Sequence, residues 1–236
     1  MKKNRILLFI TICILFVACK NIEQEKTKKK LYSYYSNGNI KTKYECSDSI
    51  KDGIYKKFYQ NGKLWEKGYF LKGKENGLFV TYDSLGNKIK EQIFALAYKN
   101  DAYNFYTEDT FDIDKKESFI NSEIKYNKNG SIDSLNSFFY KTYQNKSTIK
   151  LGDTLICIVD LAASMFKSKQ SEYIFCYRSL DNKDTTYMTS SNRHYDMLKY
   201  VPKLRGHGKV YGMIVEKDSI KERLTTYFFN FKYYVK

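Results

Sequence analysis

The chain has 236 residues, of which 41 are Lys or Arg and 26 are Asp or Glu; its formal net charge is +15 and 42% of its residues are hydrophobic. This length and apolar content can build a core in one or two domains. The lysines are spread along the whole chain among many Asn, Ile and Tyr residues, which is typical of compositional bias and not of a compact nucleic-acid-binding patch. We therefore expect no nucleic-acid partner.

The first residues have the pattern of an export signal. Lys2, Lys3 and Arg5 precede an uninterrupted apolar stretch of 12 residues, ILLFITICILFV (6–17). A helix needs about 20 residues to cross a bilayer, so this stretch fits the hydrophobic region of a signal peptide better than a spanning helix.

The small residue Ala18 stands directly before Cys19, and the segment FVACK (16–20) resembles the lipobox of bacterial lipoprotein signal peptides. The resemblance implies that residues 1–18 are removed and that Cys19 carries lipid, palmitate among the acyl chains, which tethers the protein to a membrane. We expect it in the cell envelope, at the outer membrane of a Gram-negative bacterium. The alternative is an ordinary signal peptide, or an uncleaved anchor with an incidental cysteine.

Residues 19–30 are expected to be a flexible tether. The segment KNIEQEKTKKK (20–30) holds one apolar residue among charged and amide side chains, and it cannot bury enough surface to offset the entropy of ordering. Its run of lysines could touch anionic head groups beside the anchor.

An internal repeat of 24 residues follows. One series is YYSNG (34–38), FYQNG (58–62) and YDSLG (82–86), which Tyr106 extends in register, and a second is DGIY (52–55), NGLF (76–79) and NDAY (100–103). Asn-Gly pairs favour tight turns that need positive φ, and the flanking aromatic residues favour strands, so each unit is expected to be a β-hairpin. Single hairpins cannot bury their own face, which predicts that they join into one elongated sheet over residues 31–106. Cys46 occupies the position of Phe70 and Phe94 and is expected to face the core.

The pattern DGIY (52–55), FYQNGKL (58–64) and KENG (74–77) resembles the variant MORN repeats of many bacterial proteins, including a group labelled as antitoxins. The resemblance implies a hairpin sheet. It indicates little about function, because such arrays occur in scaffolds, membrane-associated proteins and enzyme appendages. An antitoxin role fits poorly with an export signal.

Residues 107–148 are expected to continue the array or to link it to a second domain, with YNKNGSI (126–132) as one more hairpin turn. Residues 149–236 contain five or more strand-like runs without a helical period, beginning with the apolar run LICIVDL (155–161), and they predict a small antiparallel β-sandwich. Short stretches such as GKVYG (208–212) resemble immunoglobulin-like domains of bacterial surface proteins. Cys157 and Cys176 either pair in a disulfide or are small buried apolar residues.

No catalytic or metal-binding pattern is present in the sequence. His194 and His207 are the two histidines, and neither has a partner at metal-ligand spacing; His207, in RGHG (205–208), fits a tight turn. We predict neither an enzyme nor a cofactor. The alternative is an envelope enzyme or an effector-neutralising, immunity-like protein whose site leaves no sequence signature.

Aromatic side chains are the remaining candidates for function. Strand alternation sends Leu64 and Trp65 to opposite faces, and Leu64 is the more usual core residue, which leaves Trp65 outward. Exposed Tyr and Trp residues make good contact surfaces. Tyr35, Tyr59 and Trp65 are therefore predicted to bind a protein or glycan of the envelope, unless the second domain covers that face.

The anchoring hypothesis predicts that Cys19→Ala releases the protein from the membrane fraction. Mass spectrometry of the wild type should show that residues 1–18 are missing. A variant that stays with the membrane, together with a wild type that keeps residues 1–18, would contradict the lipoprotein interpretation.

Overall fold

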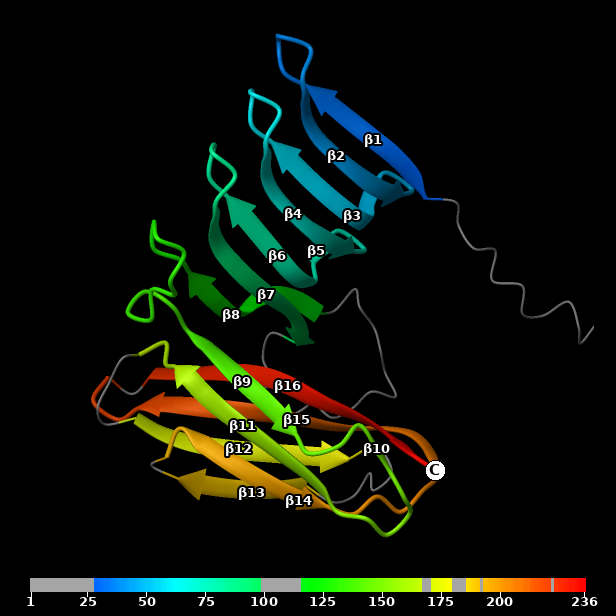
Figure 1. Cartoon of the computed structure of the whole chain (residues 1–236), viewed down its shortest axis with the longest axis vertical. Helices are drawn as coiled ribbons and strands as arrows, with labels where there is room; N and C mark the ends of the chain where they lie inside the picture. Colours follow the sequence, from blue (N-terminus) through cyan, green and yellow to red (C-terminus); the bar gives the residue numbers. More distant parts are fainter. Residues whose placement is uncertain (1–27, 99–115, 167–170, 180–185, 192, 222) are drawn as a thin grey trace, which may run out of the picture.

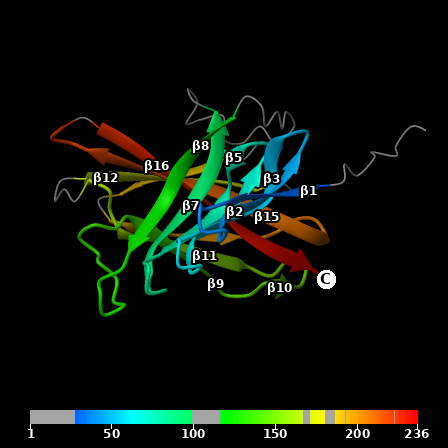
Figure 2. The same ribbon diagram turned by 90° about the horizontal axis from the view of Figure 1, so that it is seen from above.

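The structure is a computed structural model that describes residues 28–98, 116–166, 171–179, 186–191, 193–221 and 223–236. These residues form sixteen β-strands and no helix. An elongated sheet occupies one end of the molecule and a two-sheet sandwich the other (Figure 1). Viewed from above, strands of the elongated sheet cross those of the sandwich obliquely (Figure 2). The all-β prediction, a repeat sheet followed by a sandwich-like part, is confirmed.

The elongated sheet, here called the repeat sheet, is an antiparallel meander. Its order is β1-β2-β3-β4-β6-β7-β8, with β5 paired to β4. Aromatic and β-branched residues, which suit a pleated half-buried surface, recur along its strands. The strands are β1 (Lys29–Tyr34), β2 (Ile40–Ser47), β3 (Ile50–Phe58), β4 (Leu64–Leu71), β5 (Lys74–Glu75), β6 (Gly77–Tyr82), β7 (Lys88–Tyr98) and β8 (Lys116–Lys125).

Four turns of one geometry lie along one side of the repeat sheet (Figure 1). In each, the glycine N–H donates to the carbonyl three residues earlier, and only the glycine has positive φ. This is a type I turn closed by a glycine bulge. The glycines are Gly38 (φ 83°), Gly62 (φ 82°), Gly86 (φ 97°) and Gly130 (φ 82°). The predicted equivalence of the first three is confirmed, and the turn predicted at residues 126–132 is present.

The other side of the sheet has tighter turns with the same 24-residue spacing. Asp48 and Ser49 have φ of 50° and 67°, and Lys72 and Gly73 have φ of 47° and 83°. Two successive residues with positive φ match a type I′ hairpin, whose twist fits that of the flanking strands. One repeat is therefore two strands, a glycine-bulge turn and a tight turn.

A column of aromatic rings forms the core of the repeat sheet. Tyr55 and Phe70 lie 5.3 Å apart between ring centroids, Phe70 and Phe79 5.6 Å, and Phe79 and Phe94 5.0 Å, all edge to face. This geometry is favoured between aromatic quadrupoles. Cys46 is buried, as predicted from its repeat position.

Two packed sheets form the sandwich, with orders β10-β16-β15-β12-β13 and β14-β11-β9. All pairs are antiparallel except the short parallel pair β10-β16. Burial alternates along β11, so its apolar run faces one core between the sheets. The strands are β9 (Phe139–Gln144), β10 (Thr148–Ile149), β11 (Leu155–Ala163), β12 (Ser171–Ser179), β13 (Thr186–Ser191), β14 (Tyr195–Tyr200), β15 (Gly206–Asp218) and β16 (Arg223–Val235).

Asn121 joins the two parts of the molecule. The register of β7 and β8 shifts between Ile93 and Phe94, which leaves Asn121 as the extra residue of a bulge. Its side chain accepts from the Phe228 amide at 2.6 Å and donates to the Phe228 carbonyl at 2.7 Å. The Tyr140 hydroxyl donates to the same carbonyl. Because Asn121 is only 2% exposed, these bonds form away from water and fix β8 against β16.

The described residues of the segment 107–148 contribute strands to both parts of the fold: β8 to the repeat sheet and β9 to the sandwich. β8 completes the repeat sheet, whereas β9 pairs with β11 in the sandwich, which thus includes residues before 149. Residues 1–27, with Cys19 and most of the tether, and the repeat positions at 100–106 lie outside the described residues. Within the described part, no helix could span a membrane.

The glycine turns predict a specific pattern of stability. Gly62→Val should lower the free energy of unfolding by more than about 1 kcal/mol, because a β-branched residue is strained at positive φ. An added Cβ would meet no atom within 4 Å, so the loss would come from the backbone. Gly62→Asn is the matched control, since Asn tolerates this conformation, and urea unfolding should show a clearly smaller loss. Equal losses would contradict the assignment.

Candidate functional site

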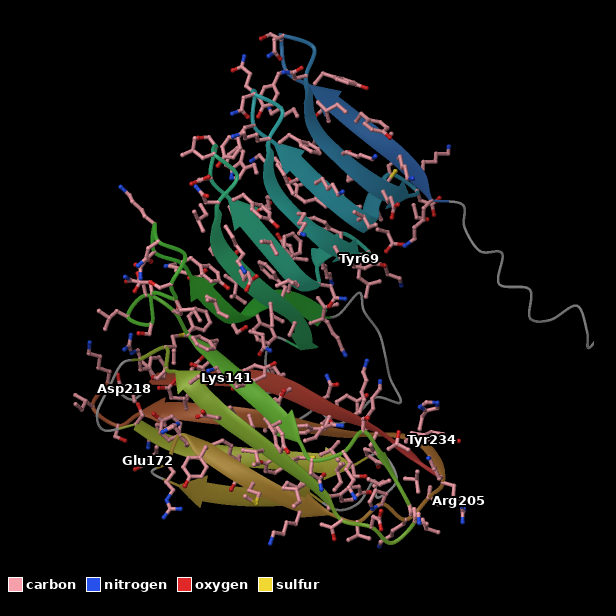
Figure 3. All side chains as sticks on the ribbon, in the orientation of Figure 1. Tyr69, Lys141, Glu172, Arg205, Asp218 and Tyr234 are labelled. Carbon is pink, nitrogen blue, oxygen red and sulfur yellow. The ribbon has the colours of Figure 1, made fainter. Side chains whose placement is uncertain are left out.

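The repeat sheet has two unlike faces, which follow from its register. Residues directly opposite each other on neighbouring strands share a face, and alternate residues along a strand lie on opposite faces. The aromatic face carries the ring column of Tyr44, Tyr55, Phe70, Phe79 and Phe94. The open face carries the alternate set, Tyr32, Tyr34, Ile40, Lys43, Ile54, Lys56, Lys67, Tyr69, Leu78 and Ile93. Figure 3 shows side chains on both sides of this sheet, with Tyr69 labelled.

Tyr35 and Tyr59 connect successive repeats. The Tyr35 hydroxyl donates to the Phe58 carbonyl at 2.7 Å, and the Tyr59 hydroxyl donates to the Tyr82 carbonyl at 2.8 Å. Both side chains are half-buried. Each hydroxyl therefore has a structural task, while part of each ring remains accessible for the predicted contact.

Asparagines of the same turns repeat this connection. The Asn37 amide donates to the Gln60 carbonyl at 3.3 Å, and the Asn61 amide donates to the Ser84 carbonyl at 3.2 Å. Asp83 takes the place of the tyrosine in the third turn, and its carboxylate accepts from amides of its own turn. Hydrogen bonds from Asn87 hold the Asp83 pKa below its usual range despite the opposing effect of burial. The side-chain hydrogen bonds from Tyr35, Tyr59, Asn37 and Asn61 each join one turn to the next, whereas Asp83 bonds within its own turn.

Trp65 lies on the side opposite to the one expected. The register shifts so that Lys57 pairs with Glu66 and Phe58 with Leu64, which makes Trp65 an extra residue. Its ring stacks on Tyr59 at 5.1 Å, and the Lys57 ammonium lies 3.6 Å from the ring centroid. Lys57 follows Tyr55 by two residues, so Trp65 belongs to the aromatic face, half-buried at its turn end, and Leu64 to the open face. The three predicted contact residues thus lie near the glycine turns.

The open face exposes large apolar side chains, whereas Val80, opposite Lys67 on the same face, is buried. Ile54 is 53% exposed and Leu78 52%, and neither belongs to a core cluster. Other exposed members are Tyr32, Tyr34, Ile40, Tyr69 and Ile93. Apolar surface of this kind, rimmed by polar groups, is typical of an interaction site.

A row of lysines crosses the open face. Lys43 lies directly opposite Lys56, and Lys56 lies directly opposite Lys67, so three neighbouring strands carry lysines at paired positions of one face. The row begins at Tyr32, whose ring lies 5.5 Å from the Lys43 ammonium, and on the other side it meets Val80. Like charges directly opposite each other destabilise a sheet. We define Lys43, Lys56 and Lys67 as the lysine row.

A shallow hollow of about 140 Å³ lies beside the lysine row. Lys30, Lys43 and Lys56 line it together with Tyr44, Glu45 and Ile54. The Glu45 carboxylate accepts the Ile54 amide at 3.0 Å, so it is already engaged by the backbone. Three lysines against one glutamate give the lining of the hollow a net positive charge.

The sequence interpretation missed the lysine row because it treated the lysines as solvated. Their spacing of 24 residues between Lys43 and Lys67 is visible in the sequence and matches the repeat. The position of Lys56 between them depends on the register of β3, which the hydrophobic pattern alone did not define.

The two histidines form no recognisable catalytic arrangement. His194 Nδ1 lies 2.7 Å from the Asp160 carboxylate at an exposed position, and the His207 ring lies 4.8 Å from that of Tyr234. Within the described part of the chain, no three His, Cys, Asp or Glu residues are grouped to hold a metal.

Glu216 is the most buried acidic group of the sandwich. Its carboxylate, which is fully buried, accepts hydrogen bonds from the hydroxyls of Ser164, Ser171 and Tyr227, the last at 2.8 Å. Burial, with the nearby Glu216 charge, raises the pKa of Tyr227. These hydroxyl groups satisfy the hydrogen-bonding capacity of the buried carboxylate, so we assign Glu216 a structural role.

Cys46, Cys157 and Cys176 are free thiols and all three are buried. Cys157 belongs to the core between the sheets, whereas Cys176 packs with Met213 and Val215 in a separate cluster. Cys157 and Cys176 therefore do not form a disulfide; they are small buried apolar residues, the second of the two interpretations from the sequence. Burial raises the pKa of the Cys157 thiol to about 12.

No family model matches the chain, and no curated protein matches it.

The buried thiols give a testable expectation. Iodoacetamide at pH 8 should modify Cys46, Cys157 and Cys176 slowly in the folded protein and quickly in urea, because all three side chains are buried away from the reagent. Peptide mapping by mass spectrometry distinguishes the sites. Fast modification of Cys157 without denaturant would contradict its placement.

Proposed function

We propose that this chain is a lipid-anchored envelope protein that binds a partner through its MORN-like repeat sheet and catalyses no reaction. The observation that carries the proposal is the open face, on which exposed apolar and aromatic side chains adjoin a row of lysines. The proposed anchor is lipid on Cys19, and the proposed partner is a protein or glycan of the envelope.

The energetics of the open face support binding. Ile54 and Leu78 each keep about half of their surface exposed after folding, and Tyr69 keeps more than a third, so apolar surface remains in contact with water. An interface that removes this apolar surface from water would be favourable by about 25 cal/mol per Å² before the costs of association. The fold already has its own cores in the ring column and the sandwich, so these residues are available for a partner.

The construction of the repeat sheet supports a rigid platform. Tyr35 and Tyr59 bond each turn to the next, and Asn121 fixes the last strand to the sandwich. A preorganised surface loses less entropy when it binds. Tyr35, Tyr59 and Trp65 remain proposed contacts at the turn end of the aromatic face.

Substitutions on the open face test this function. Ile54→Ser combined with Leu78→Ser should leave the melting temperature within a few degrees, because both side chains are about half exposed. The same variant should lose the partner that wild type captures when it is cross-linked in native envelopes.

The control is a double substitution of similar exposure on the sandwich, Leu204→Ser with Leu224→Ser, at 62% and 65%. It should capture the partner like wild type. Retention by the open-face variant, or equal loss by the control, would contradict binding through the repeat sheet.

A further inference from the structure

We propose that the lysine row is a binding site for a linear polyanion, an acidic polysaccharide that lies across strands β2, β3 and β4. The inference rests on the proposed binding function of the repeat sheet and specifies the chemical class of its ligand. Three features carry it: the register of the lysines, the direction of the row and the groups around it.

The register places three like charges on neighbouring strands, where the lysines outnumber the nearby acids Glu45 and Glu91. Lys43 contacts the Tyr32 ring, Lys67 lies 5.9 Å from the Tyr82 ring, and within the described part of the chain Lys56 has neither an ion pair nor a ring contact. This arrangement costs folding free energy, since directly opposed like charges repel. Anionic groups bound along the row would offset the repulsion between the lysines, because each ammonium group would then have a negative partner.

Acidic groups near the row are few. Against the opposing effect of burial, hydrogen bonds from Lys88 and Tyr126 lower the pKa of Glu91, and the charge of Lys67 adds to this lowering. Glu45 is held by the Ile54 amide. The centre of the row, Lys56, is therefore free to meet an external anion.

The direction of the row selects the shape of the ligand. Neighbouring strands are about 4.8 Å apart, so the Cα atoms of the three lysines form a line perpendicular to the strands with a span of about 10 Å. A peptide that added to this sheet would run parallel to the strands at an edge and would not follow the row. A polymer with regularly spaced carboxylates or phosphates can lie along it.

Sheet twist argues against a flat membrane as the ligand. Neighbouring strands rotate by about 20–25°, so the outer lysines of the row differ in direction by about 40–50°. A planar layer of head groups meets one or two of them well, whereas a flexible chain can follow all three. Tyr32 and Tyr69 are exposed beside the row, each with a lysine ammonium near its ring, and their remaining ring surface offers an apolar contact for a sugar.

The decisive variant is Lys56→Glu in the full chain, kept in detergent micelles. The substitution places an acid between Lys43 and Lys67, so the melting temperature should rise, while affinity for polygalacturonate should fall by roughly tenfold or more. Lys56→Gln keeps the test informative if the first variant does not fold. Lys232→Glu, an exposed site on β16, makes the same change of net charge and should leave affinity within about twofold.

Polygalacturonate, neutral dextran and vesicles with anionic phosphatidylglycerol are the three probes. We expect binding to polygalacturonate alone that depends on Lys56 and weakens with salt. Equal binding to dextran, binding that Lys56→Glu leaves unchanged, or dependence on Lys56 only with the vesicles would overturn the proposal. If Lys56→Glu still captures the envelope partner that the Ile54 and Leu78 variant loses, the polyanion site fails while the binding function stands.

Discussion

The structure depends on one constraint, the closure of each hairpin by a glycine at positive φ within a 24-residue unit. Gly38, Gly62 and Gly86 return the chain at the same level of each repeat, which allows Tyr35 and Tyr59 to reach the backbone of the next turn. The register that results stacks the aromatic rings on one face and leaves lysines in a row on the other. Core and proposed binding surface are thus two consequences of one repeat.

Much of this architecture could be predicted from local sequence signals. Asn-Gly turns and the 24-residue period indicate the hairpins, and the repeat position of Cys46 predicts its burial. The turn signal lies within the few residues of each loop, and the 24-residue period repeats it along the chain. The apolar run that begins at Leu155 likewise predicts a strand of the sandwich core, and β11 is that strand.

Features that depend on register or on distant contacts could not be predicted. Trp65 is the extra residue of a β-bulge and has no partner on β3, so its side chain lies on the aromatic face. Simple strand alternation predicts the opposite face. Asn121 bonds to Phe228, 107 residues away, with no local signal. The lysine row was invisible for a similar reason, since Lys56 meets its neighbours only through strand pairing.

The central claim, that the open face meets an envelope ligand, is tested most directly by lysine labelling in place. Intact envelopes and detergent-extracted protein are treated with an acetylating reagent, and modification is mapped by mass spectrometry. The account predicts that Lys43, Lys56 and Lys67 are protected in the envelope and labelled after extraction, while the exposed sandwich residues Lys199 and Lys232 are labelled equally in both. Equal labelling of the lysine row in both, or protection confined to the sandwich, would contradict it.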